Sequence, residues 1–99
     1  MRILLLCNQG MSTSALVRNM YKYVDENVTI EAHAITNYED VIGNFDVVLL
    51  GPQIRYKIDE VGKVAAEHGI KAALIDPMAY GMLDGQKVVD QAYKLVSNK

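Results

Sequence analysis

The segment ILLLCNQGMSTS, residues 3–14, sets the architecture that the sequence predicts. Its first four residues form a continuous apolar run, which is typical of a parallel β-strand covered on both faces. A short loop with one glycine and three hydroxyl residues follows, and an apolar stripe at helical spacing extends from Thr13 to Val24. A strand, a polar loop and a helix in direct succession predict the opening unit of an alternating α/β fold.

Three further apolar runs predict strands at residues 29–34, 47–50 and 72–75. The run at 29–34 alternates with polar residues, so we expect it at an edge of the sheet. Helical stripes cover residues 54–65 and 88–96, and Gly69 is expected to cap the end of the first. Thr36–Glu39 is typical of a capping box that opens a short helix.

This β-α-β-α-β-α-β-α order predicts a three-layer α/β fold, with a four-stranded parallel sheet and helices on both faces. Right-handed crossovers favour strand order 2-1-3-4, a topology like that of flavodoxin or of low-molecular-weight phosphatases. In such sheets ligands bind outside the carboxyl ends of the strands where the chain reverses direction, here between strands 1 and 3. We therefore expect the functional site in the loops that follow Leu6 and Leu50.

Length and composition narrow the class of protein. A chain of 99 residues predicts a single domain, residues 1–99. A formal net charge of -2 without a basic run argues against a nucleic-acid partner. The lone Cys7 suits a reducing compartment, so a cytoplasmic location is expected. The apolar run at 3–7 is too short for a signal peptide or a membrane span, so we expect no direct membrane insertion.

Cys7 lies in the first of the two candidate loops, and its thiolate is a candidate nucleophile. Gly10 permits a left-handed turn that points successive backbone N–H groups at one anion, and the N-terminus of a helix also favours phosphate. The alternative is a small buried apolar residue at a strand end, but the polar loop at the predicted crevice favours the nucleophile. The predicted phosphate-binding loop comprises Asn8, Gln9, Gly10, Met11, Ser12, Thr13 and Ser14.

The second candidate loop is expected to support the first. It comprises Gly51, Pro52 and Gln53, where glycine allows a close approach of the backbone and proline stiffens the turn. Four further side chains are possible members of the rim of the site, namely Arg55, Tyr56, Asp76 and Tyr80. Apolar side chains suited to docking partner proteins are expected near the same rim at Met11, Ile54, Met78 and Met82.

The sequence lacks the motifs of several other classes of nucleotide-binding, redox and metal-binding proteins. The sequence has no Gly-Lys-Ser/Thr ending of a P-loop, no Gly-x-Gly-x-x-Gly and no Cys-x-x-Cys. His33 and His68 stand alone, so we expect neither a metal nor a bound cofactor.

The closest competing function is that of a cysteine-dependent phosphatase. Such loops end in Cys-x-x-x-x-x-Arg-Ser/Thr, and Thr13 stands at the arginine position, so the guanidinium that clamps the phosphoryl group is missing. Asp76-Pro77 resembles the general acid of low-molecular-weight tyrosine phosphatases and is one feature in favour of hydrolysis. We give the missing arginine more weight, because without it a cysteinyl phosphate should survive for transfer. A module that binds a mononucleotide such as FMN is a third reading of the fold.

The sequence resembles enzyme IIB of the bacterial sugar phosphotransferase system, of the lactose/cellobiose/chitobiose type. The resemblance spans essentially the whole chain and is most specific in residues 7–14, 47–54 and 75–85. The Gly-Met-Ser-Thr-Ser form of the loop favours the cellobiose and chitobiose branch. The resemblance implies that Cys7 accepts phosphate from a phosphohistidine of enzyme IIA. It further implies that Cys7 donates the phosphate to a sugar translocated by the membrane permease, enzyme IIC.

Overall fold

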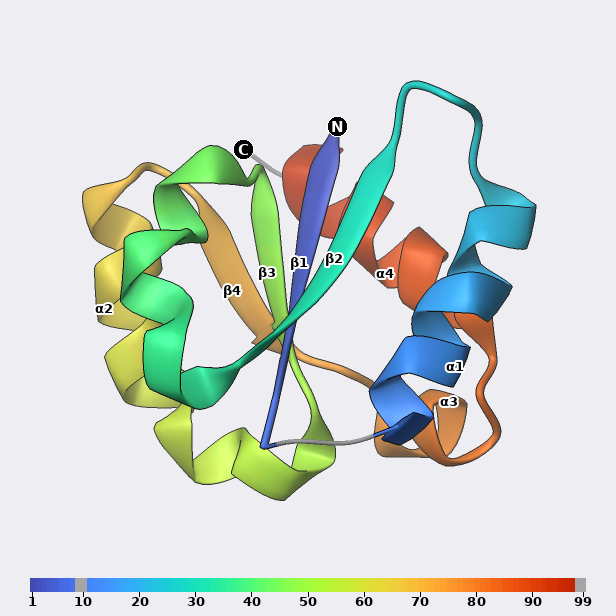
Figure 1. The fold of residues 1–99 in the computed structure, drawn as a ribbon. Coiled ribbons are helices and arrows are strands. Elements are labelled where there is room, and N and C mark those ends of the chain that lie inside the picture. The colour runs from blue at the N-terminus through green and yellow to red at the C-terminus, as the bar shows by residue number, and fades with distance from the viewer. Residues whose placement is uncertain (9–10, 98–99) are drawn as a thin grey trace.

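The computed structural model describes residues 1–8 and 11–97 (Figure 1). The strands are β1 (Arg2–Cys7), β2 (Thr29–Ala34), β3 (Val47–Leu50) and β4 (Lys71–Leu74). The α-helices are α1 (Met11–Met20), α2 (Ile58–Glu67), α3 (Pro77–Gly81) and α4 (Gly85–Ser97). Short 3-10 helices cover Tyr21–Tyr23, Ile35–Asp40, Ile42–Asn44 and Pro52–Lys57.

The four strands form one parallel sheet in the order β2-β1-β3-β4, which confirms the predicted topology. The prediction that the second strand lies at an edge is confirmed as well. In the register of the sheet Leu6 pairs with His33 of β2 on one side and with Leu50 of β3 on the other. The carboxyl ends of these strands therefore meet at one edge of the sheet, toward the bottom of Figure 1.

Helices cover both faces of the sheet, as the sequence predicts (Figure 1). Successive side chains of β1 point to opposite faces. Ile3 and Leu5 pack in one core cluster with residues of α1 and α4. Leu4 and Leu6 pack in a second cluster with residues of α2 and of the 3-10 helices Ile35–Asp40 and Ile42–Asn44. The side chains of residues 3–6 are all fully buried, so the strand that ends in Cys7 runs through the centre of the domain.

The predicted capping box at Thr36–Glu39 is wrong. The segment forms a 3-10 helix that begins at Ile35, and no side chain caps its start. Tyr38 decides the geometry here, because its ring is only 2% exposed and its hydroxyl donates a hydrogen bond to Oε2 of Glu60 at 3.0 Å. Tertiary packing against α2 has overridden the local capping signal.

Other boundaries shift slightly. The helix predicted at residues 54–65 begins as the 3-10 helix Pro52–Lys57 and continues as α2. Gly69 follows the end of α2 with φ 73°, a conformation that glycine adopts without strain, as predicted. The fourth strand lies one residue earlier than predicted. Among the helices of the described residues, none has the length and apolar character that crossing a bilayer requires.

Candidate active site

Cys7 is the last residue of β1 and lies at the carboxyl edge of the sheet. Its side chain is 8% exposed, and its Sγ lies 3.9 Å from the carbonyl oxygen of His33 on β2. Alternation along β1 directs the thiol to the face of Ile3 and Leu5, which is the face that α1 covers. A central, fully packed strand thus holds the sulfur at the edge where the sequence predicts a ligand site.

The predicted phosphate-binding loop is described only in part. Outside the described part of the chain lie Gln9, Gly10 and the side chains of Met11, Ser12 and Thr13. α1 begins at Met11, so the hydroxyl residues occupy its first turn. The N–H groups of a first turn have no acceptor within the helix, and they favour an anion. Asn8 and Ser14 have exposed side chains on either side of this region.

The second loop lies directly beside the end of β1. The backbone N–H of Gly51 donates to the carbonyl oxygen of Leu6 at 2.9 Å, one residue before Cys7. A Cβ atom at Gly51 would lie 3.0 Å from Oε1 of Gln53 and 3.6 Å from the ring of Tyr80, so glycine fits because space is short. Pro52 begins the 3-10 helix that follows. Nε2 of Gln53 donates to the hydroxyl of Tyr80 at 3.3 Å, which ties this loop to the segment after β4.

Tyr80 lies in a short helix and is buried. The sequence predicts a loop there, but Tyr80 belongs to α3 and its side chain is only 8% exposed. Asp76 precedes this helix, and its Oδ1 accepts a hydrogen bond from the backbone N–H of Met78 at 2.9 Å. Pro77 occupies the first position of α3, where its missing N–H costs nothing. The Asp76-Pro77 pair therefore has a structural use as the start of a helix.

The remaining rim residues differ in exposure. Arg55 and Tyr56 are exposed on the 3-10 helix Pro52–Lys57, and Tyr56 is 72% exposed. Met78 and Met82 are also exposed, at 65% and 72%. Ile54 is fully buried in the core cluster beneath α2, so the prediction that it lies at the rim is wrong. It lies in the 3-10 helix that precedes α2, and its side chain packs inward against the core.

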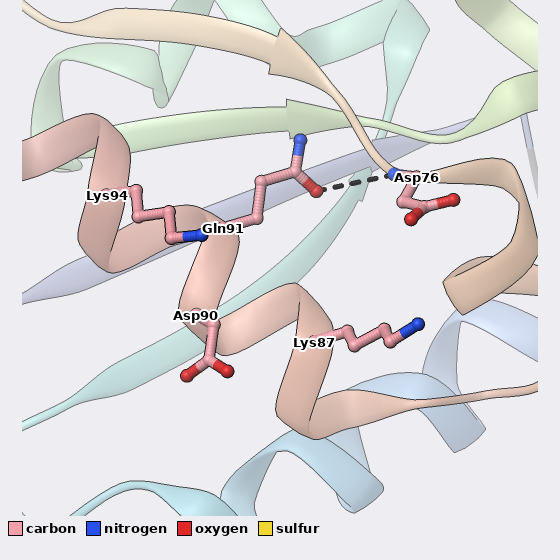
Figure 2. A pocket seen from close by; sticks show the side chains of 5 residues that line it. All are labelled: Asp76, Lys87, Asp90, Gln91 and Lys94. Carbon is pink, nitrogen blue, oxygen red and sulfur yellow. Dashed lines mark hydrogen bonds between the residues drawn. The ribbon is translucent and has the colours of Figure 1, made fainter.

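One contact near the site escapes the sequence patterns. Gln91 of α4 reaches the segment that leaves β4, and its Oε1 accepts a hydrogen bond from the backbone N–H of Asp76 at 3.3 Å (Figure 2). A lone glutamine in an amphipathic helix gives no signal for such a role. Only the folded arrangement, which brings α4 alongside the end of β4, identifies the residue.

These residues form a site suited to covalent chemistry on an anion. The thiol of Cys7 lies at the end of β1, and the first turn of α1 follows in the chain. The loop that begins at Gly51 is hydrogen-bonded to Leu6, the residue before Cys7. Within residues 1–8 and 11–97 the structure shows no group of three or more acidic, histidine or cysteine side chains arranged to hold a metal ion.

Comparison with known proteins assigns the family. The family model described as "PTS system, Lactose/Cellobiose specific IIB subunit" matches residues 2–91. The oligo-beta-mannoside-specific EIIB component of Bacillus subtilis (strain 168) is 40% identical over 101 residues, covering 99% of this chain and 98% of that protein. The galactose-specific EIIB component of Lactococcus lactis subsp. cremoris (strain MG1363) is 36% identical over 103 residues, covering 96% of this chain and 95% of that one. The cellobiose-specific EIIB component of Lactococcus lactis subsp. lactis (strain IL1403) is 35% identical with the same coverage.

Solved structures agree. The cellobiose-specific phosphotransferase IIB component of Borrelia burgdorferi has a TM-score of 0.81 and 41% identity, covering 100% of this chain and 94% of that one. The lactose-specific IIB component domain of Streptococcus pneumoniae has a TM-score of 0.80 at 22% identity, covering 94% and 97%, and supports the flavodoxin-like fold alone. Similarity over the full length, in sequence and in fold, thus shows that the chain belongs to the lactose/cellobiose-specific IIB subunits of the sugar phosphotransferase system, phosphotransferases that act in sugar uptake.

Proposed function

We propose that Cys7 is the residue of this IIB subunit that carries the phosphoryl group. The observation that supports this most strongly is the position of Cys7, at the carboxyl end of a central strand, one residue beyond the contact with Gly51. It is also the only cysteine in the sequence. The proposed carrier therefore has no rival thiol in the chain.

The proposed mechanism has two transfers. The thiolate of Cys7 attacks the phosphorus of a phosphohistidine on enzyme IIA, the S–P bond forms, and the P–N bond breaks with the electron pair returning to the imidazole. A hydroxyl group of the sugar, held by enzyme IIC, then attacks phosphorus. The O–P bond forms, the S–P bond breaks to release the thiolate, and the hydroxyl proton passes to solvent. The backbone N–H groups of residues 8–14 hold the phosphoryl oxygens through both steps, so positioning and electrostatics supply most of the catalysis.

The phosphocysteine is proposed to persist between the two transfers. Thr13 stands where a phosphatase places its arginine, so hydrolysis lacks the bidentate clamp on the phosphoryl group. The carboxylate of Asp76 is engaged at the start of α3, which weakens the case for a phosphatase general acid. The named relatives are all components of sugar transport, and they favour neither a phosphatase nor an FMN-binding module.

We assign supporting roles to the second loop and the rim. Gly51, Pro52 and Gln53 fix the surroundings of the cysteine loop, and Tyr80 holds Gln53. Enzyme IIA and enzyme IIC dock in turn on the exposed apolar side chains beside this edge. These are Tyr56, Met78 and Met82, with Arg55 as a cation close to the incoming phosphate.

The proposed sugar is a disaccharide of the cellobiose or chitobiose type, and the proposed location is the cytoplasm. The sequence of the cysteine loop favours this branch, whereas the relatives are named for oligo-beta-mannosides, galactose and cellobiose. A lone thiol that must stay reduced fits the cytoplasm. Uptake assays with each sugar, in cells that lack their own IIB subunit, decide the substrate.

The direct test is phosphorylation by the purified donor cascade. Incubation with phosphorylated enzyme IIA should add one phosphoryl group, and peptide mapping should locate it on Cys7. Cys7→Ser should accept none under the same conditions. Label on His33 or His68 would refute the assignment, and rapid turnover of an aryl phosphate by the wild-type protein would support a phosphatase instead.

A further inference from the structure

One side chain caps the carboxyl end of the free edge of β4. β4 lies at the end of the sheet and pairs only with β3. The N–H of Ile75 donates to the carbonyl oxygen of Leu50 at 2.8 Å, so the carbonyl of Leu74 and the N–H of Asp76 point the other way, out of the sheet. The amide of Gln91 bonds both, because its Nε2 donates to the carbonyl oxygen of Leu74 and its Oε1 accepts from the N–H of Asp76 at 3.3 Å. Figure 2 draws the second of these bonds.

Asp76, which Gln91 holds, sets the start of α3. Its Oδ1 accepts from the N–H of Met78 at 2.9 Å, and its carbonyl oxygen accepts from the N–H of Tyr80 at 2.9 Å. Asp76 thus caps the first turn of α3, and its own N–H is bonded to Gln91 of α4. A shift of Asp76 is passed to Tyr80 through these bonds.

Tyr80 in turn touches the loop beside the thiol. Its hydroxyl accepts from Gln53 at 3.3 Å, and its ring lies next to the backbone of Gly51. Gly51 donates to the carbonyl of Leu6, the residue before Cys7. A continuous set of contacts therefore runs from α4 to the end of β1.

From these contacts we infer that Gln91 is a positioning residue for phosphoryl transfer. By holding the exit of β4, it fixes α3 and keeps Tyr80 against the second loop. The inference rests on the proposed role of Cys7. Gln91 touches none of the reacting groups, so its effect is on the geometry of the loops and not on the chemistry itself.

The surroundings of Gln91 make its role separable from folding. It lines an open hollow of about 430 Å³ together with Asp76, Lys87, Asp90 and Lys94 (Figure 2). In a variant that lacks the amide, water from this hollow can bond the exposed backbone groups of Leu74 and Asp76. We therefore expect the fold to survive while the position of α3 becomes less well defined.

The opposite edge of the sheet offers a matched control. There the hydroxyl of Tyr21 accepts from the N–H of Ile30 at 2.8 Å and donates to its carbonyl oxygen at 2.9 Å. Ile30 pairs with Ile3, at the far end of β1 from Cys7. Tyr21→Phe removes a side-chain cap of the same kind, with two hydrogen bonds, and leaves the active-site edge untouched.

The test compares Gln91→Met with Tyr21→Phe in the phosphorylation assay, well below their melting temperatures. Gln91→Met should lower kcat at saturating phosphorylated enzyme IIA roughly tenfold, because the loops around Cys7 are then less well positioned. KM should rise as well, because α3 carries Met78 of the proposed docking surface. Tyr21→Phe should transfer phosphate at the wild-type rate, even if its melting temperature falls by as much as that of Gln91→Met. Combining Gln91→Met with Tyr80→Phe should slow transfer no further than the slower single variant, because both act through one path.

Three outcomes would overturn the inference. These are a wild-type rate for Gln91→Met, an equal slowing by Tyr21→Phe, or additive losses in the double variant. If Gln91→Met does not fold, Gln91→Glu keeps the length and the acceptor for Asp76 but cannot donate to Leu74 when ionised, and the same comparison applies. Failure of the wild-type protein to accept phosphate on Cys7 would instead refute the proposed function.

Discussion

Gly85 begins α4 at the point where this helix touches α1, and the contact is close enough for one methyl group to disrupt it. The backbone N–H of Gly85 donates to Oδ1 of Asn19 at 2.7 Å. A Cβ atom at Gly85 would lie 2.5 Å from the backbone nitrogen of Met20 and 2.7 Å from the carbonyl carbon of Asn19. Backbone atoms inside a helix cannot move aside cheaply, so Gly85→Ala should push the two helices apart.

The expected cost follows from two opposing terms. Overpacking a well-packed contact costs about 1–3 kcal/mol, and the backbone atoms involved place this site at the upper end. Replacing glycine by alanine in a helix returns up to about 1 kcal/mol through helix propensity. The net loss is about 2 kcal/mol, which for a domain of this size lowers the melting temperature by about 8–16 °C.

The control is a second glycine-to-alanine change in a helix. Gly62 lies within α2, and a Cβ atom there would meet nothing within 4 Å. Gly62→Ala should therefore gain about 0.5–1 kcal/mol and raise the melting temperature by about 2–8 °C. Thermal unfolding followed by circular dichroism measures both variants. A melting temperature of Gly85→Ala within about 3 °C of the wild type would mean a shift far smaller than expected and would refute the steric reasoning.

Three further changes test other parts of the structure. Burial and the hydrogen bond to Glu60 raise the pKa of Tyr38 to about 12 from its ordinary value of 10.0, so the fold favours the neutral phenol. The resulting stabilisation is complete below pH 10 and is lost as the pH rises toward 12. Between these pH values the free energy of unfolding of the wild type, measured with urea, should fall by about 2 kcal/mol more than that of Tyr38→Phe. Gly51→Ala should slow phosphoryl transfer with little change in melting temperature, because the new Cβ displaces the flexible end of Gln53 and not the backbone. Asp76→Ala should cost about 0.5–2 kcal/mol through the lost cap of α3, whereas Asp76→Asn should retain both stability and transfer; a sharp loss of transfer in Asp76→Asn would revive the general-acid reading.

The strands and their order could be predicted because each signal is local. The run at residues 3–6 is apolar on both faces since it is the centre of the sheet, and Gly69 ends α2 because that position requires a positive φ. The position of the proposed carrier Cys7 follows from the same pattern, since a parallel sheet places the ends of its strands together. These features need no knowledge of distant contacts.

Most of the failures involve contacts between segments far apart in the chain, and one involves a short helix with a local cap. Thr36 does not cap its helix because Tyr38 is held by α2, and Ile54 is buried because the 3-10 helix Pro52–Lys57 packs it into the second core cluster. Tyr80 lies in a helix that Asp76 caps, where the sequence predicts a loop. Gln91 has no local signal at all, since its two partners precede it by 17 and 15 residues.

The two edge contacts have a consequence for how this domain behaves at high concentration. An open parallel sheet ends in two rows of unpaired backbone groups, and such rows are templates on which another chain can add a strand. Here Tyr21 occupies the outward N–H and carbonyl of Ile30, and Gln91 occupies those of Asp76 and Leu74. An incoming strand must break these bonds before it can pair at those positions. At these positions the two polar side chains therefore oppose the pairing of an added strand.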